Sequence, residues 1–232
     1  PHYPEQALKR FEAGYKNIAD PARRSYAAIV STTDHYIGQI VDKLEALNLR
    51  ENTIIIFTSD NGHSEETGNR IRVDNHKSGY PKGHFYGASG GGATGKWIGQ
   101  KGSFLEGGVR VPAIISYPAK LPKGEVRGQI ITAMDWLPTV LDLCGVQQLS
   151  SAPKLDGHSV LPLIRSAKAK SKYKVLHFAW GKKWAVREGD WKLIGSNGNT
   201  KVSLRNLADA KPEIVQHLRT LHSSWVKEVS PK

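Results

Sequence analysis

The sequence predicts an α/β fold followed by a small antiparallel-sheet subdomain that ends in a helix. Residues 21–47 place apolar side chains at spacings of three and four, which is typical of an amphipathic helix packing on a sheet. The continuous apolar run Ile54–Phe57 follows and predicts a strand buried on both faces, as in a parallel sheet. Beyond residue 174, short apolar segments alternate with turns, which favours antiparallel hairpins. Helix, short loop and buried strand in succession indicate an α/β layer architecture.

Length and composition are those of a globular protein with a substantial core. The chain has 232 residues, of which 39% are hydrophobic and 23% charged. No stretch approaches the ~20 consecutive apolar residues of a membrane helix, so we expect no membrane partner. The first residues, PHYPEQ, contain neither an initiator Met nor the pattern of a signal peptide. We therefore expect this chain to be a processed piece, a piece freed of a tag, or a truncated piece of a longer protein.

The net charge of +12 favours anionic partners. Basic residues occur throughout the chain and are densest at Arg165–Lys183. The plain interpretation of the surplus is solubility, followed by steering of a small anionic substrate into a cleft. The chain has no aromatic-interleaved RNA-binding pattern and no helix-turn-helix spacing, so nucleic acid is not an expected partner.

The N-terminal elements lead to the central strand. Glu5–Tyr15 is weakly helical. Asp20 and Pro21 are typical of a helix N-cap and first helical residue, and the helix they begin runs to about Leu47.

The middle of the chain combines a long loop with further strands and helices. Residues 62–108 have little periodicity, and a loop of this length is usually functional or disordered. The single cysteine, Cys144, lies on an apolar helix face and is expected to be a buried core thiol. The elements predicted here are strands at Val111–Tyr117 and Gln129–Thr132, a helix at Trp136–Cys144 and a helical stub within Leu155–Ile164.

We place a boundary in the basic segment that follows, between a first domain of residues 1–168 and a second of residues 169–232. The second domain is predicted as hairpins with a terminal helix. Its elements are strands at Lys174–Trp180, Lys183–Glu188 and Trp191–Ile194, and a helix at about Pro212–Val229.

The first chemical signal follows the central strand, where Asp60, Asn61 and Gly62 end the apolar run. In α/β sheets, ligands bind just past the carboxyl ends of the strands. Carboxylate and amide oxygens are ligands for calcium or magnesium, so these side chains could form half of a cation site. Taken alone, Asp-Asn-Gly favours a simple turn over a cation site, and only the rest of the chain reverses that order.

Two other patterns are weaker. Gly90–Trp97 nearly matches a phosphate-binding P-loop, but its Lys lacks the following Ser or Thr and no apolar strand precedes it. The spacings of His63, His76 and His84 match no zinc motif. We interpret these histidines as surface residues, except His63, which adjoins Asp60 and Asn61.

An ordered set of motifs resembles one known family over essentially the whole chain. The set is similar to the C-terminal part of a type I sulfatase, an arylsulfatase-like enzyme of the alkaline-phosphatase superfamily. This resemblance implies an alkaline-phosphatase-like sandwich, represented by the C-terminal part of its large mixed sheet and the flanking helices. The motifs are TIIIFTSDNG, QKGSFLEGGVRVP, MDWLPTVLDLCGV, LDGHSVLPLI and WAVREGDWKLI.

The resemblance implies a role for each residue that matches the family's pattern. Asp60 and Asn61 would bind Ca²⁺, or Mg²⁺ in its place, and Lys101 would contact the sulfate group. His2 would also contact the sulfate and protonate the leaving oxygen, and His63 is a further candidate for substrate binding. Glu106 and Arg110 we interpret as an ion pair that braces the Gly107-Gly108 turn.

The family's nucleophile is a formylglycine made within a Cys-X-Pro-X-Arg motif, and this chain contains neither that motif nor the family's Asp-Asp metal pair. We expect both in a missing N-terminal half of the same protein, which would be this chain's main partner. The 232 residues alone are expected to be inactive.

The expected function is therefore that of part of a calcium-dependent sulfatase acting on a sulfated glycan or an aryl sulfate. One alternative is a phosphodiesterase or phosphonate hydrolase of the same superfamily, and another is a non-catalytic protein that binds sulfated glycans. The resemblance implies a periplasmic, extracellular or lysosomal location. Residues expected to line the mouth of the cleft are His63, His84, Tyr86 and Trp97.

Overall fold

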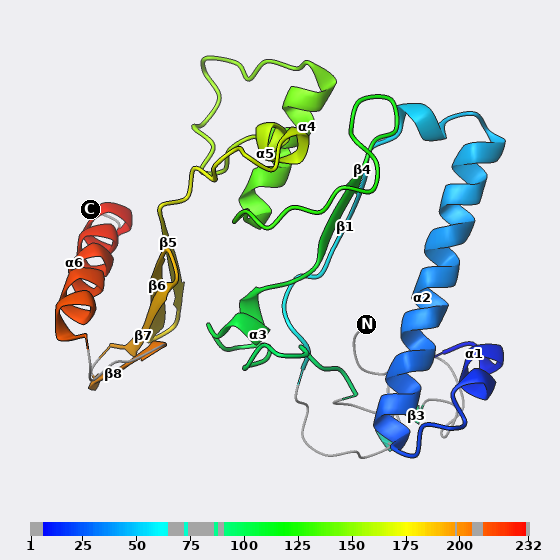
Figure 1. Ribbon diagram of the computed structural model, residues 1–232, viewed down its shortest axis with the longest axis horizontal. Coiled ribbons are helices and arrows are strands. Elements are labelled where there is room, and N and C mark those ends of the chain that lie inside the picture. The colour runs from blue at the N-terminus through cyan, green and yellow to red at the C-terminus, as the bar shows by residue number, and fades with distance from the viewer. Residues whose placement is uncertain are drawn as a thin grey trace. The chain divides into compact units, whose positions relative to one another are not determined.

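The computed structural model describes residues 7–64, 72–73, 86–87, 91–197, 199–205 and 211–230 (Figure 1). The chain divides into two units, Pro1–Ala119 and Lys120–Lys232. The boundary that we predict near residue 168 lies within the second unit and stays a prediction. In the described residues, no helix is both long enough and apolar enough to cross a membrane.

Two helices open the first unit, α1 (Lys9–Gly14) and α2 (Pro21–Ala46). The predicted start of α2 is confirmed, because the Asp20 side chain accepts a hydrogen bond of 3.0 Å from the backbone N–H of Arg23. The Leu8 N–H donates to the Thr32 hydroxyl over 3.0 Å and thereby fastens α1 to α2.

The central strand, β1 (Ile55–Thr58), pairs with β4 (Ala113–Ser116). The pairing is antiparallel, with Ile55 opposite Ser116, and not parallel as predicted from the apolar run. Phe57 and its partner Ile114 are 42% and 59% exposed, so the predicted burial of both strand faces is also wrong for the described chain. A continuous apolar run fixes neither the direction of the neighbouring strand nor the layer that covers it. The shorter elements of this unit are η1 (Arg50–Asn52), β2 (Arg72–Val73), β3 (Tyr86–Gly87) and α3 (Glu106–Val109).

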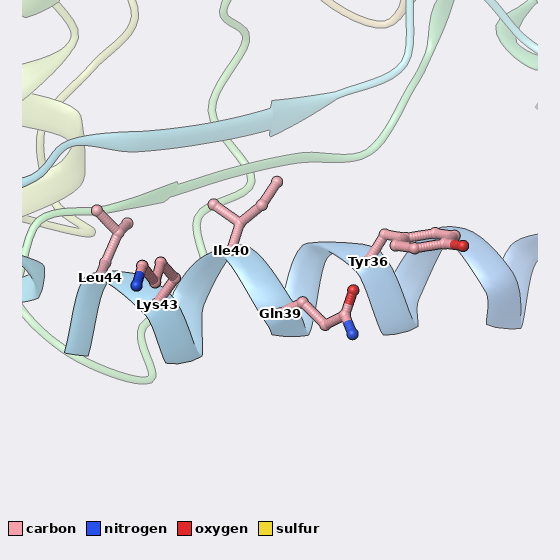
Figure 2. A pocket seen from close by; sticks show the side chains of 5 residues that line it. All are labelled: Tyr36, Gln39, Ile40, Lys43 and Leu44. Atoms are coloured by element: carbon pink, nitrogen blue, oxygen red, sulfur yellow. The ribbon is translucent and has the colours of Figure 1, made fainter. Parts of the chain in front are cut away.

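The apolar face of α2 is open rather than packed on a sheet as predicted. Tyr36 is 50% exposed and Ile40 is 60% exposed. A hollow of about 440 Å³ lies along this face, and all the residues that line it belong to α2 (Figure 2). These residues are Tyr36, Gln39, Ile40, Lys43 and Leu44.

The second unit begins with helices arranged around a buried carboxylate. Its helical elements are η2 (Ala133–Asp135), α4 (Trp136–Cys144) and α5 (Leu161–Arg165). Asp135 is fully buried, and its carboxylate accepts hydrogen bonds from the Thr132 N–H (2.7 Å), the His158 N–H (2.8 Å) and the Tyr173 hydroxyl (2.6 Å). Burial and the hydrogen bond to Asp135 raise the pKa of Tyr173 to about 12.

Two predictions for this part of the chain are wrong. Gln129–Thr132 is not a strand, because its backbone is bound by side chains: Ser171 donates to the Ile130 carbonyl, and the Thr132 N–H donates to Asp135. Cys144 is exposed and not a core thiol. The predicted helix Trp136–Cys144 is confirmed as α4, and Gly145 ends it in the left-handed conformation with φ of 68°.

A four-stranded antiparallel sheet completes the second unit, with strand order β5-β6-β7-β8. Helix α6 (Pro212–Val229) packs on this sheet around a core of Trp184, Val186, Leu193 and Leu218 (Figure 1). The predicted hairpins and terminal helix are confirmed, whereas the fourth strand was not predicted. The strands are β5 (Val175–Trp180), β6 (Lys183–Glu188), β7 (Trp191–Ser196) and β8 (Asn199–Arg205).

Candidate active site

The loop after β1 brings two oxygen-bearing side chains together. The Asn61 amide donates a hydrogen bond of 2.5 Å to the Asp60 carboxylate, and the Asp60 side chain is exposed. The Ser59 hydroxyl donates to the Asn61 carbonyl over 2.8 Å and tightens this turn. The two predicted cation ligands therefore converge at the strand tip.

This donor set suits a hard cation but is incomplete. Asp60 offers carboxylate oxygens, and a half-turn of the Asn61 amide exchanges its NH₂ group for its carbonyl oxygen. Calcium takes about six to eight oxygen ligands, so these two residues fit as part of a site. Among the described residues, no group of three or more His, Cys, Asp or Glu side chains could hold a metal ion.

A second loop joins this tip through the backbone. The Lys101 N–H donates to the His63 carbonyl over 2.8 Å, and the Gly62 N–H donates to the Gly108 carbonyl over 3.0 Å. Lys101 itself is exposed, so its ammonium group is available to a ligand. The structure thus brings the backbone of Lys101 to His63, two residues after Asn61, although about 40 residues separate Lys101 from Asn61 in the chain.

Glycines make this close approach possible. A Cβ atom on Gly62 would lie 1.7 Å from the Gly107 carbonyl oxygen, and one on Gly107 would lie 2.1 Å from the Gly99 carbonyl oxygen. Any side chain at either position would push the two loops apart. From the sequence, Gly62 and Gly107 were predicted only as turn residues, and the sole signal for this packing role was the Gly-Gly pair.

A tight turn presents Lys101. The Ser103 N–H donates to the Gln100 carbonyl over 3.0 Å, and the Ser103 hydroxyl donates to the same oxygen over 2.9 Å. Gly102 has a φ of 82°, a left-handed conformation that favours glycine. The backbone of this lysine is therefore held from both sides, while its side chain extends into solvent.

The predicted ion pair is confirmed on α3, where the Arg110 guanidinium lies 3.6 Å from the Glu106 carboxylate. The same guanidinium lies 4.2 Å from the centre of the Trp97 ring, and the Lys96 ammonium lies 4.9 Å from it. Trp97 therefore links two cations close in sequence to Lys101.

His63 is partly buried, and its Nδ1 is buried without a hydrogen-bond partner among the described residues. An orphaned ring nitrogen two residues after Asn61 in the chain is consistent with the predicted role in substrate binding. The predicted catalytic residue His2 lies outside the described residues, as does His84. The Tyr86 side chain is not described.

Similarity to solved structures shows the fold. The chain has a TM-score of 0.75 with Ps i-CgsB in complex with k-i-k-neocarrahexaose, at 24% identity over 97% of this chain and 48% of that chain. It has a TM-score of 0.55 with the phosphonate monoester hydrolase of Silicibacter pomeroyi, at 18% identity over 89% of this chain and 40% of that chain. The fold is the alkaline-phosphatase-like fold of sulfatases, as predicted.

Sequence comparisons then identify the family. Residues 1–146 match the Sulfatase family model, and residues 96–214 match the model for the C-terminal part of N-sulphoglucosamine sulphohydrolase. The chain belongs to the sulfatase family. It is 34% identical to mouse steryl-sulfatase over 74% of this chain and 26% of that protein. It is 32% identical to human arylsulfatase D over 72% of this chain and 27% of that protein. The chain thus spans about a quarter of the length of these relatives.

Proposed function

We propose that this chain is part of a sulfatase that hydrolyses a sulfate ester. In this proposal Asp60 and Asn61 provide two oxygen ligands for a calcium ion, and Lys101 contacts the sulfate group. The observation that carries the proposal is the hydrogen bond of 2.8 Å from the Lys101 N–H to the His63 carbonyl, since it joins the lysine loop to the strand tip.

The chemistry of the reaction accounts for these side chains. Cleavage of a sulfate ester develops negative charge on the sulfuryl oxygens and on the departing oxygen. The Lys101 ammonium stabilises the first charge, and its fixed backbone keeps it oriented during the reaction. A calcium ion, when bound, supplies Lewis-acid stabilisation of the same oxygens. His2 is proposed to protonate the departing oxygen.

The remaining parts of the site are proposed to lie outside these 232 residues. The single cysteine, Cys144, is followed by Gly145 and Val146 and so is no formylglycine precursor. We assign the formylglycine and the other metal ligands to an N-terminal half of the same protein, and a periplasmic, extracellular or lysosomal location to the whole.

The substrate class is proposed to be a sulfated glycan or an aryl sulfate. A solved structure in complex with its substrate D-glucosamine-2-N,6-O-disulfate has a TM-score of 0.60 with this chain. The match of residues 96–214 to the C-terminal N-sulphoglucosamine sulphohydrolase model supports the same class.

The test uses the full-length parent protein with p-nitrophenyl sulfate and p-nitrophenyl phosphate as substrates. We expect faster hydrolysis of the sulfate ester, loss of activity on calcium chelation, and a kcat/KM lowered about 10²-fold or more by Lys101→Ala. Lys123→Ala, at an exposed lysine far along the chain, serves as the control and is expected to leave kcat/KM unchanged. Preference for the phosphate ester would favour the phosphodiesterase or phosphonate hydrolase alternative and overturn the proposal.

A further inference from the structure

The segment between α5 and β5 presents a regular row of charge. Four lysines at every second position are exposed: Lys168, Lys170, Lys172 and Lys174. The three residues between them are only partly exposed: Ala169, Ser171 and Tyr173. We call residues 166–174 the lysine segment. Because two residues of chain span at most about 7 Å, its four charges are closely and evenly spaced along the backbone.

Hydrogen bonds to the preceding part of the second unit hold the first half of the lysine segment. The Gln129 amide donates to the carbonyl of Ala167 over 2.9 Å and to that of Ala169 over 3.0 Å. These bonds fix the backbone on both sides of Lys168.

The second half is held in the same way. The Ser171 hydroxyl donates to the Ile130 carbonyl over 2.6 Å, and the Tyr173 hydroxyl donates to the buried Asp135 carboxylate over 2.6 Å. The alternate residues therefore bind inward and the lysines between them remain in solvent. A backbone fixed in advance lowers the ordering cost of binding a ligand.

The charge of this region is uncompensated along the sequence. Residues 165–183 contain seven Lys and Arg and no Asp or Glu, in a chain whose net charge is +12. In the described part of the chain, none of the four lysines forms an ion pair. Solubility alone does not require the lysines to alternate with residues that are bound inward.

We propose that the lysine segment is a binding surface for a linear sulfated glycan. This inference rests on the proposed function in one respect. The surface would hold a polymeric substrate by sulfate groups other than the one that is hydrolysed. Single-stranded nucleic acid fits less well, because such sites combine positive charge with aromatic side chains on which bases stack. The aromatic residue of the segment, Tyr173, is bound through its hydroxyl to buried Asp135.

The test measures binding of the 232-residue chain to heparin over a range of salt concentrations. One variant carries Lys→Gln at all four lysines of the segment. The control variant carries Lys→Gln at four exposed lysines spread over the chain, and so has the same net charge: Lys16, Lys123, Lys154 and Lys227. Circular dichroism checks that both variants fold, as expected for changes at exposed side chains.

We expect the segment variant to raise the Kd for heparin at least about tenfold at physiological salt. The slope of log Kd against log salt concentration should fall by about one for each lysine–sulfate ion pair that the variant removes, and the control variant should keep the original slope. Equal weakening in both variants would show an effect of net charge only and overturn the proposal. Tighter binding of a single-stranded oligonucleotide of equal charge, abolished in the same variant, would overturn it in favour of a nucleic-acid surface.

Because heparin binding needs no turnover, the two proposals fail separately. An inactive parent protein with segment-dependent heparin binding would contradict the proposed function and support the surface. An active parent protein whose heparin binding ignores the segment would contradict the surface alone.

Discussion

At the scale of single residues, the candidate site depends on positions where a side chain has no room. Gly107 lies against the Gly99 carbonyl, and Gly62 lies against Gly107. Both contacts are between backbone atoms, which cannot rotate away as a side chain can. The loop that carries Lys101 therefore keeps its place beside the strand tip because three glycines allow it.

We predict that Gly107→Ala destabilises the chain by about 2 kcal/mol or more, because the new Cβ atom would lie 2.1 Å from the Gly99 oxygen. Chemical denaturation measures the change in the free energy of unfolding. Gly38→Ala in α2 is the matched control, since among the described residues no atom outside its chain neighbours and the backbone of its own helix lies within 4 Å of the added Cβ. This control is expected to stabilise the helix by roughly 0.5–1 kcal/mol. Equal effects of the two changes would contradict the packing argument.

The buried carboxylate gives a second prediction. In Asp135→Asn an NH₂ group would face a hydrogen-bond donor, and we expect a loss of about 3 kcal/mol in the free energy of unfolding. The pKa of Tyr173, raised to about 12, should return toward 10, as measured by phenolate absorbance. Asp142→Asn is the control, because that exposed carboxylate accepts one hydrogen bond from the Ser159 hydroxyl. A Tyr173 pKa unchanged by Asp135→Asn would contradict the role given to the carboxylate.

The sequence points to the polar side chains of the candidate site more directly than to the glycines that hold its loops together. Asp60 and Asn61 carry the oxygen atoms that a cation site requires, and Lys101 carries a positive charge that suits a sulfate group. Their proposed roles could therefore be inferred from residue type and motif. The role of Gly107 depends on which distant loop lies against it, and a Gly-Gly pair alone does not reveal that contact. The orphaned nitrogen of His63 was likewise invisible before its surroundings were known.

At the scale of elements, α6 is held to its sheet partly by stacked rings. His222 stacks on Trp184 with ring centres 4.2 Å apart, and His177 stacks on Trp225 with ring centres 4.9 Å apart. The Nδ1 atoms of both histidines are buried without a hydrogen-bond partner in the described structure. Burial lowers the pKa of each histidine; for His177 the charge of His222 lowers it further and Glu228 opposes the shift.

We predict that the attachment of α6 weakens in acid. The pKa of each histidine is lower in the folded chain than its ordinary value of 6.5, so the unfolded chain binds more protons. The two neutral histidines therefore make their full contribution to the free energy of unfolding above pH 6.5. That contribution is lost as pH falls through the pKa values of the folded chain. Denaturation from about pH 8 to about pH 5 should show this loss, and replacing both histidines by Phe should reduce it.

The control for this prediction is His217→Gln, at an exposed histidine that pairs with Glu188 at a distance of 2.8 Å. It leaves both stacked histidines in place, so the acid-induced loss of stability should persist. A pH profile that is the same with and without His177 and His222 would contradict the prediction.

Elements were predictable where the sequence pattern is local. Helices α2, α4 and α6 have strong apolar periodicity and clear terminal residues, and all three were placed correctly. The strand predicted at residues 129–132 is absent. The Ile130 carbonyl accepts a tertiary hydrogen bond from Ser171, and the Thr132 N–H donates to the Asp135 carboxylate three residues further on, so neither group is free for a strand ladder. Strand β8 was missed because its sequence, NTKVSLR, is largely polar.

At the scale of the whole molecule, apolar surface in the first unit lies open where the sequence predicts burial. Ile40 on α2, Phe57 on β1 and Ile114 on β4 are 60%, 42% and 59% exposed. The chain covers 48% of the Ps i-CgsB chain that it matches. The periodicity and the apolar run predict burial of these residues, and the described structure contradicts that prediction, because an apolar pattern does not specify which surface would cover it.

We therefore predict that the 232-residue chain binds the dye 8-anilinonaphthalene-1-sulfonate and self-associates, because exposed apolar surface promotes both. Replacing Ile40 by Gln and Phe57 by Thr should lower dye fluorescence and shift sedimentation toward the monomer without loss of stability, since both side chains are exposed. Val126→Gln, at a single side chain that is 89% exposed, should change neither measurement.

In a longer parent protein, replacing Ile40 by Gln and Phe57 by Thr is expected to lower the free energy of unfolding by about 1–3 kcal/mol each, because burial there would remove the same surface from water. Monomeric chain without dye binding would contradict this prediction, and so would a parent protein that tolerates both changes.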